Sequence, residues 1–183
     1  MPTRRTVLAA MIVAALAPAA VAAEPLPLMG TRQDGAHVAP GDIGGWRLVY
    51  FGYTHCPDIC PLGLQTIAEA LDALGPLGEK ITPVFVTVDP ERDTPELMKN
   101  YVGFFHPRLI GLSPSDDELK VMAKAWRVKY ARVEIGEGRP YLMDHTATIL
   151  FADPQGAPAG RLGHDLGGAK LAEKLRGVLE SRP

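Results

Sequence analysis

The chain has 183 residues, of which 46% are hydrophobic and 22% charged. This balance is typical of a globular protein and excludes a disordered one, and the length corresponds to one domain with or without a short leader. The formal net charge of −2 includes no basic excess, which argues against nucleic acid as a partner.

Residues 1–23 have the layout of a bacterial export signal. Two arginines precede an alanine-rich apolar run, and small residues close it. The run is short for a membrane span and is broken by Pro18. We therefore expect 1–23 to be a signal peptide, or else an uncleaved anchor in the inner membrane, and 24–183 to be one periplasmic domain. Loss of the leader removes two basic side chains and no acidic one, which leaves a net charge of −4.

Turn residues and hydrophobic periodicity predict the elements in chain order. The segment 28–38 reads as an N-terminal β-hairpin that turns at Asp34-Gly35. The continuous apolar run 46–53 is typical of a central strand buried on both faces. Further strands are expected at 81–89, 109–113 and 146–153, a second hairpin at 131–145, and helices at 61–75, 93–105, 115–128 and 167–181.

This alternation of strands and helices indicates an α/β sandwich with a mixed central sheet and helices on both faces. A cysteine loop leaves the central strand and enters a helix, which makes the predicted fold specifically thioredoxin-like. In this interpretation the hairpin at 131–145 is inserted before the last strand, 146–153.

Both cysteines of the chain, Cys56 and Cys60, lie in the stretch "YFGYTHCPDICPLG". They could form a structural disulfide, a redox-active pair or part of a metal site. A bridge across so short a loop restricts the unfolded chain little, so it would stabilise the fold little. The start of a helix favours thiolate, the form that attacks disulfides and binds metals. Three intervening residues still allow a disulfide, and they also allow both sulfurs to share one ion at a separation of up to about 4.6 Å.

Two thiolates alone would be an incomplete metal site, so we looked for a third ligand among the five histidines. His145 stands at the start of a predicted strand, in a loop that faces the cysteine loop in thioredoxin-like folds. His55 adjoins Cys56, but we expect its side chain to point elsewhere. From the residues alone, an ordinary polar or hydrogen-bonded role for His145 is favoured slightly over a role as a ligand.

Three motifs resemble the Sco/SenC family of copper proteins, which assist assembly of the dinuclear copper site of cytochrome c oxidase. They are "FGYTHCPDICP", "VTVDPERDTPE" and "DHTATILFADPQG", in this order and spacing. The resemblance extends from about Leu28 to the last helix. It implies a thioredoxin-like domain whose metal ligands are Cys56, Cys60 and His145. Soft thiolates select Cu(I), and one imidazole lets the same site accept Cu(II).

Three acidic residues in these motifs are candidates for a supporting role. The resemblance implies that Asp89 and Asp93 help in copper handling or docking, although a turn and a helix cap at Asp93 or Thr94 would account for them equally well. Asp144, beside His145, could support the ligand or simply lie at the surface.

Two functions remain open at this point. The first is a copper carrier that passes its ion to the copper-site subunit of cytochrome c oxidase. The second is a thiol–disulfide reductase that keeps the cysteines of that subunit reduced, and a peroxidase of the same fold is a distant third. An oxidising periplasm would convert Cys56 and Cys60 to a disulfide that cannot hold copper. We therefore expect a periplasmic thiol reductase as a partner, and another copper chaperone is a further candidate partner.

Overall fold

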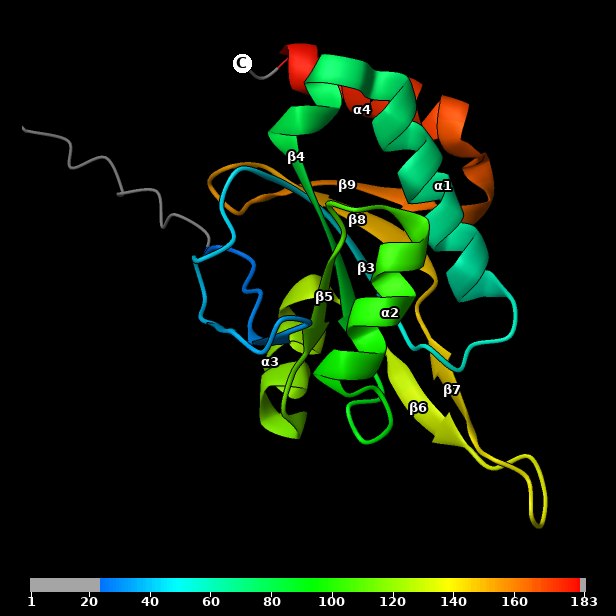
Figure 1. Ribbon diagram of the computed structural model, residues 1–183. Helices are drawn as coiled ribbons and strands as arrows, with labels where there is room; N and C mark the ends of the chain where they lie inside the picture. The colour runs from blue at the N-terminus through cyan, green and yellow to red at the C-terminus, as the bar shows by residue number, and fades with distance from the viewer. Residues whose placement is uncertain (1–23, 182–183) are drawn as a thin grey trace, which may run out of the picture.

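The computed structural model describes residues 24–181, so the predicted leader at 1–23 lies outside the described residues. Seven strands form one mixed sheet in the order β2-β1-β5-β4-β3-β8-β9, and β6 and β7 form a separate antiparallel pair (Figure 1). The strands are β1 (Gly30–Arg32), β2 (His37–Val38), β3 (Trp46–Gly52), β4 (Ile81–Thr87), β5 (Ile110–Ser113), β6 (Tyr130–Val133), β7 (Leu142–His145), β8 (Thr148–Ala152) and β9 (Pro158–Gly163). The helices are α1 (Ile59–Leu74), α2 (Pro95–Phe105), α3 (Asp116–Trp126) and α4 (Gly168–Ser181), with 3₁₀ turns η1 (Gly75–Lys80) and η2 (His164–Leu166).

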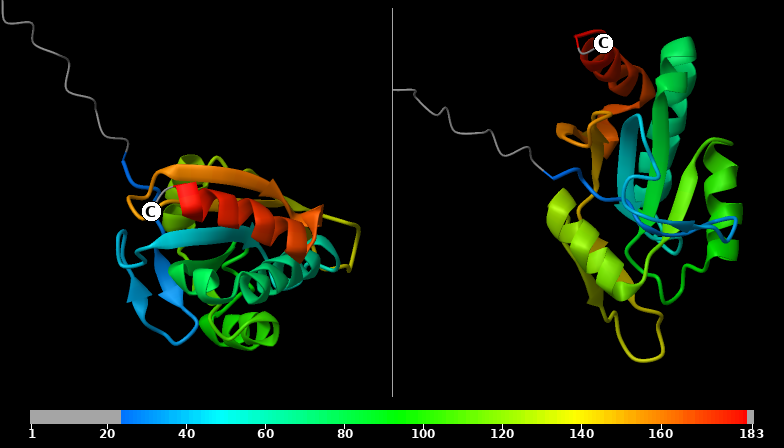
Figure 2. Two further views of the ribbon diagram at one scale, coloured as in Figure 1. Left: turned by 90° about the horizontal axis from the view of Figure 1, so that it is seen from above. Right: turned by 90° about the vertical axis from the view of Figure 1, so that its left-hand side faces the viewer.

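The centre of the sheet is β3, all of whose residues are buried. It runs parallel to β4 and antiparallel to β8, and β4 is in turn parallel to β5. Successive side chains of a strand point to opposite faces. Tyr50 accordingly lies under α1, where a Cβ on Gly63 would touch its ring, whereas Phe51 contacts Trp126 of α3. Figure 2 shows α1 and α2 on one face of the sheet and α3 on the other.

The mixed sheet, the covered faces and both predicted hairpins confirm the thioredoxin-like α/β prediction. The position of the inserted hairpin needs one correction, because the strand that follows it is not the last. After the turn at 154–156 the chain returns as β9, which pairs antiparallel with β8 at the edge of the sheet. Sequence analysis missed β9 because "PAGRLG" has no apolar alternation and lies half exposed.

The fold gathers the three recognised motifs at one end of the sheet. The cysteine loop follows the carboxyl end of β3, and the loop 88–94 follows the carboxyl end of the parallel neighbour β4. Such ends are the usual place for function in α/β sheets. The hairpin β6–β7, which lies between α3 and β8 in the chain, is found at the same end of the sheet (Figure 1). Within residues 24–181, none of the helices combines the length and apolar character needed to cross a bilayer.

Candidate metal centre

The cysteine loop brings both sulfurs to the start of α1. The helix begins at Ile59, two residues earlier than predicted, so Cys60 lies within its first turn. The N-cap residue Asp58 makes no side-chain capping bond. Instead the Cys56 sulfur accepts a hydrogen bond from the backbone N–H of Cys60 at 3.4 Å. One of the free N–H groups of a helix start is thus satisfied by a potential metal ligand.

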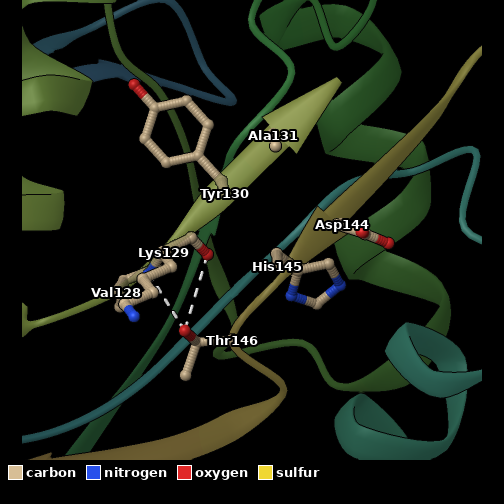
Figure 3. A pocket seen from close by; sticks show the side chains of 7 residues that line it. All are labelled: Val128, Lys129, Tyr130, Ala131, Asp144, His145 and Thr146. Carbon is tan, nitrogen blue, oxygen red and sulfur yellow. Dashed lines mark hydrogen bonds between the residues drawn. The ribbon is translucent and has the colours of Figure 1, made fainter. Parts of the chain in front are cut away.

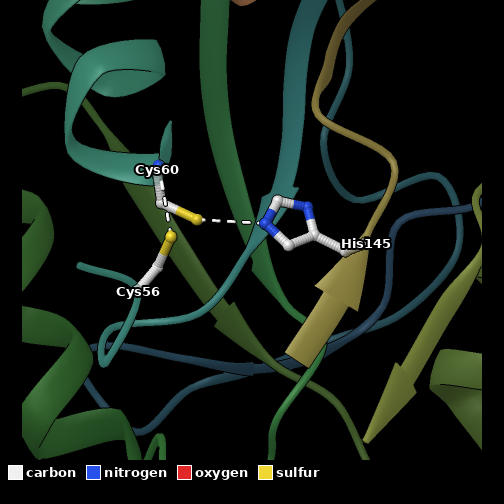
Figure 4. A group of neighbouring side chains, drawn as sticks. All are labelled: Cys56, Cys60 and His145. Carbon is white, nitrogen blue, oxygen red and sulfur yellow. Dashed lines mark hydrogen bonds between the residues drawn. The ribbon is translucent and has the colours of Figure 1, made fainter. Parts of the chain in front are cut away.

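His145, the last residue of β7, completes a three-ligand cluster with these cysteines. Its Nε2 atom lies 3.2 Å from the Cys60 sulfur (Figure 4). One ligand atom each of Cys56, Cys60 and His145 lies within 4.8 Å of the others. Both cysteines are free thiols and are buried, and His145 is half-buried. These three side chains therefore lie close enough together to hold a metal ion.

Aromatic rings and a glycine shape the space around the cluster. Tyr50 and Tyr53 of the central strand region meet the imidazole of His145 edge-on, with ring centroids 6.3 and 6.0 Å away. A Cβ atom at Gly52 would lie 2.9 Å from the Cys60 sulfur and 2.8 Å from the ring of Phe85. Glycine at position 52 is therefore needed so that the Cys60 sulfur can approach the backbone of β3.

The two thiols differ in their electrostatic environment. A hydrogen bond from the Cys60 thiol, together with His145 and the N–H groups of Asp58 and Cys60, lowers the pKa of Cys56 to about 4 against the effect of burial. The neighbouring Cys56 thiolate and burial raise the pKa of Cys60 well above its usual range. Proton loss is thus favoured at Cys56 and disfavoured at Cys60 in the metal-free pair. A metal that binds both sulfurs must displace the proton of Cys60.

His55 lies outside this cluster, as the sequence predicted. Its Nδ1 atom contacts the Thr54 hydroxyl at 3.0 Å and lies 3.6 Å from a carboxylate oxygen of Asp93, and its side chain is half exposed.

The remaining imidazole nitrogen of His145, Nδ1, is buried and has no hydrogen-bond partner within residues 24–181. Because this nitrogen makes no hydrogen bond there, the contacts of the imidazole ring with Cys60, Tyr50 and Tyr53 hold it in position.

Asp93 is buried beneath the cysteine loop. Its carboxylate accepts hydrogen bonds from the backbone N–H of Thr54 at 2.9 Å and from the hydroxyls of Thr54 and Thr87 at 2.5 and 2.6 Å. Its carbonyl accepts a further bond from Ser113 at 2.7 Å. The N-cap of α2 is Thr94, whose hydroxyl accepts from the N–H of Leu97. Asp93 therefore supports the segment leading to Cys56 and leaves capping to its neighbour.

Asp89 lies near the start of the loop 88–94, which also contains Asp93, and it contacts the hairpin that carries His145. Its carboxylate forms an ion pair with Arg92 and accepts a hydrogen bond from the Tyr141 hydroxyl at 2.8 Å. Asp89 is only 3% exposed. The sequence had no signal for Tyr141, which lies in an expected hairpin without periodic pattern. Arg92 belonged to a recognised motif, but only the fold shows what it contacts.

Asp144 is exposed, because successive side chains of β7 point to opposite sides. It lines an open cavity of about 730 Å³ together with His145, Thr146 and the segment Val128–Ala131 (Figure 3). At the base of the hairpin, Thr146 exchanges hydrogen bonds of 2.9 Å with the backbone of Lys129. Among the described residues, no hydrogen bond joins Asp144 to His145. A supporting role for Asp144 stays a prediction.

Comparison with known proteins identifies relatives of the whole described domain. The family model SCO1/SenC matches residues 26–180. The mitochondrial SCO1 homolog 1 of Arabidopsis thaliana is 43% identical over 131 residues, which are 70% of this chain and 39% of that protein. The chain thus spans about two fifths of the length of this relative, and 38% of that of the human SCO1 homolog.

Solved structures agree with this match. The copper-bound structure of Arabidopsis thaliana ScoI superposes with a TM-score of 0.79 at 36% identity, covering 87% of this chain and 99% of that one. Copper-bound Bradyrhizobium japonicum ScoI gives a TM-score of 0.74 at 38% identity, covering 83% and 97% of the two chains. With its fold, its motifs and nearly all of its described length matched, this chain belongs to the SCO1/SenC family.

Proposed function

We propose that this protein is a copper metallochaperone that binds one copper ion through Cys56, Cys60 and His145. The observation that carries the proposal is the convergence of two sulfurs and one imidazole nitrogen within 4.8 Å. Two thiolates suit Cu(I), and the imidazole extends the site to Cu(II). Relatives more than a third identical to this chain have been solved with copper bound, which supports the same ion here.

Membership in the SCO1/SenC family supports the dinuclear site in a subunit of cytochrome c oxidase as the destination of the copper. A transfer site needs few ligands and partial access, so that the ligands of a partner can replace its own. Three ligands, one of them half-buried beside an open cavity, meet this requirement. We place the protein in the periplasm, where the predicted leader would deliver it.

Competition titration of the reduced protein with Cu(I) and a chromophoric chelator tests the proposal. Wild type is expected to bind one equivalent, Cys56→Ser to lose strong binding, and His145→Ala to bind at least about tenfold more weakly, as expected for a change at a metal ligand. His37→Ala, which alters an exposed histidine, is the matched control. If His145→Ala binds as tightly as wild type, the three-ligand site is wrong. With Cu(II), wild type is expected to show a strong thiolate charge-transfer band.

A thiol–disulfide reductase is the second candidate, favoured by the unequal exposure of the two cysteines. Cys56 is 7% exposed and accepts an N–H bond from the helix start, whereas Cys60 is 0% exposed. In this reaction the Cys56 thiolate attacks the disulfide of the oxidase subunit, forms a mixed disulfide and releases one partner thiolate. Cys60 then loses its proton and attacks Cys56. The second partner thiol leaves, the partner is reduced, and Cys56–Cys60 is oxidised.

His145 separates the two functions, because disulfide exchange does not require it. His145→Ala is expected to weaken copper binding while leaving the reduction of a model disulfide substrate intact. Either function requires a periplasmic thiol reductase as a partner, which returns the pair to its thiols. Another copper chaperone could load the site. Cells without that reductase are expected to accumulate the oxidised, copper-free protein, and a fully reduced protein in such cells would contradict this partner.

A further inference from the structure

The hairpin that carries His145 is not part of the main sheet. Within residues 24–181, β6 and β7 pair only with each other. No ladder of backbone hydrogen bonds therefore fixes the imidazole relative to the cysteine loop. Figure 1 shows the hairpin extending away from the body of the domain. His145 is the last residue of β7 and precedes the first residue of β8, Thr148, by three positions. Side-chain contacts must set the position of this ligand.

The strongest polar contacts between hairpin and body involve Tyr141, directly before β7. Its hydroxyl donates to Asp89 at 2.8 Å, and its carbonyl accepts from the Arg92 guanidinium at 3.0 Å. The guanidinium also lies 3.6 Å from the centroid of the Tyr141 ring. Arg132 of β6 covers the same ring, also at 3.6 Å. Tyr141 is thus held through its hydroxyl, its ring and its backbone by two residues of one short loop.

The same loop holds the other half of the site. Asp93 binds the backbone and the hydroxyl of Thr54, two residues before Cys56. Arg92 also lies 5.8 Å from the ring of Tyr53, which itself touches the imidazole of His145. Five consecutive residues, 89–93, therefore contact both the segment that leads to the thiols and the hairpin that carries the imidazole.

The Arg92 guanidinium contacts both the loop and the hairpin. The Nη2 atom of Arg92 is buried and has no hydrogen-bond partner within residues 24–181. A buried N–H without a partner costs free energy, which the ion pair with Asp89 and the bond to the Tyr141 carbonyl offset. The guanidinium joins an acid, a backbone carbonyl and two aromatic rings in one fixed geometry.

We propose that the 89–93 loop sets the separation between the thiol pair and the imidazole, with Asp89, Arg92 and Tyr141 as positioning residues for the metal site. Asp93 fixes the cysteine side, and the Asp89–Arg92–Tyr141 contacts fix the histidine side. The metal-binding consequence rests on the proposed function, whereas the structural consequence can be measured without metal.

The first test measures the hairpin in the metal-free, reduced protein. Tyr141→Phe removes one hydroxyl and keeps the ring, and Arg92→Lys keeps the charge but loses the planar stack. Both variants are expected to speed hydrogen exchange of the β7 amides, 142–145, relative to the amides of β3. Tyr130→Phe is the matched control, since it removes a hydroxyl of the same hairpin for which no hydrogen bond is found among the described residues. Unchanged exchange in both variants would overturn the proposal, whether or not the protein binds copper.

The second test is a double-mutant cycle with Cu(I) competition. Tyr141→Phe is expected to lower Cu(I) affinity by about tenfold, the lower range for residues that orient a metal ligand. In the His145→Ala background the same change is expected to have no further effect, because the ligand that it positions is gone. An equal loss in both backgrounds would show a general structural effect and contradict the proposal. Failure of wild type to bind Cu(I) would instead refute the proposed function and leave the exchange test decisive for the loop.

Discussion

The Nε2 atom of His145 lies 3.2 Å from the sulfur of Cys60, although 85 positions separate the two residues in the chain. The cysteine belongs to a helix that is packed on the main sheet, and the histidine belongs to a hairpin outside it. Their contact joins two parts of the fold that share no strand pairing among the described residues.

Cys56 is expected to react first with an alkylating reagent. Cys56 is the more exposed residue of the two and its sulfur accepts an N–H bond at the helix start, whereas Cys60 is fully buried. Reduced protein treated at pH 6 with less than one equivalent of iodoacetamide should carry the label on Cys56, as mapped by peptide mass spectrometry. Denatured protein, in which both thiols are accessible, provides the control. Preferential labelling of Cys60 in the folded protein would contradict the assignment.

Gly52→Ala is expected to displace the Cys60 sulfur from its position in the cluster of Cys56, Cys60 and His145. The added methyl group would lie within 3 Å of the Cys60 sulfur and of Phe85. We expect a loss of about 1–3 kcal/mol in the free energy of unfolding, the usual cost of overpacking a core, together with weaker Cu(I) binding. Gly103→Ala in α2 is the control, because no atom lies near its new Cβ and alanine favours a helix. Equal stability of the two variants in urea denaturation would contradict this prediction.

Asp93→Ala is expected to loosen the cysteine loop. Three hydrogen bonds to a fully buried carboxylate are lost, and the N–H of Thr54 is left without its acceptor. We expect a destabilisation of about 1–3 kcal/mol by chemical denaturation, because buried groups lose their partners. Asp117→Ala, at an exposed acid of α3, provides the comparison. A difference close to zero between these variants would show that Asp93 does not hold the loop.

The hydroxyl of Tyr141 links hairpin stability to pH. Burial and the hydrogen bond to Asp89 raise the pKa of Tyr141 to about 12 from an ordinary value of 10. The unfolded chain therefore loses this proton at lower pH than the folded protein. The stabilising contribution is complete below pH 10 and is lost as the pH rises toward 12. The free energy of unfolding of wild type is expected to fall more steeply over this window than that of Tyr141→Phe, and parallel slopes would contradict the raised pKa.

Local sequence signals were sufficient for most of the fold. The apolar run of β3, the proline in the first turn of α2 and the acids that begin α3 each indicate one structure, and the structure confirms these three elements. The weakly patterned segment of β9 was missed, because its pairing with β8 depends on the edge that β8 offers. Such an edge exists only once the sheet has formed.

Some residues of the candidate metal site could likewise be predicted from the sequence, and others could not. Cys56 and Cys60 could be recognised as a pair, since their proximity is local and the helix that follows them is predictable. The position of His145 came from a family resemblance, because nothing in the neighbouring residues fixes a ligand so distant in sequence. The roles of Arg92 and Tyr141 were not predictable, since a hydrogen bond between a loop and a hairpin leaves no periodic trace in either.

The separation of 85 positions between Cys60 and His145 also links metal binding to folding. An unfolded chain still holds its two cysteines close together, but bringing the imidazole to them requires closing a long loop of flexible chain. A ligand that binds only the folded form raises the free energy of unfolding in proportion to the logarithm of its concentration. A metal ion held by all three residues would therefore stabilise the folded domain selectively, whereas a metal ion held by the two thiols alone would use ligands that also lie close together in the unfolded chain.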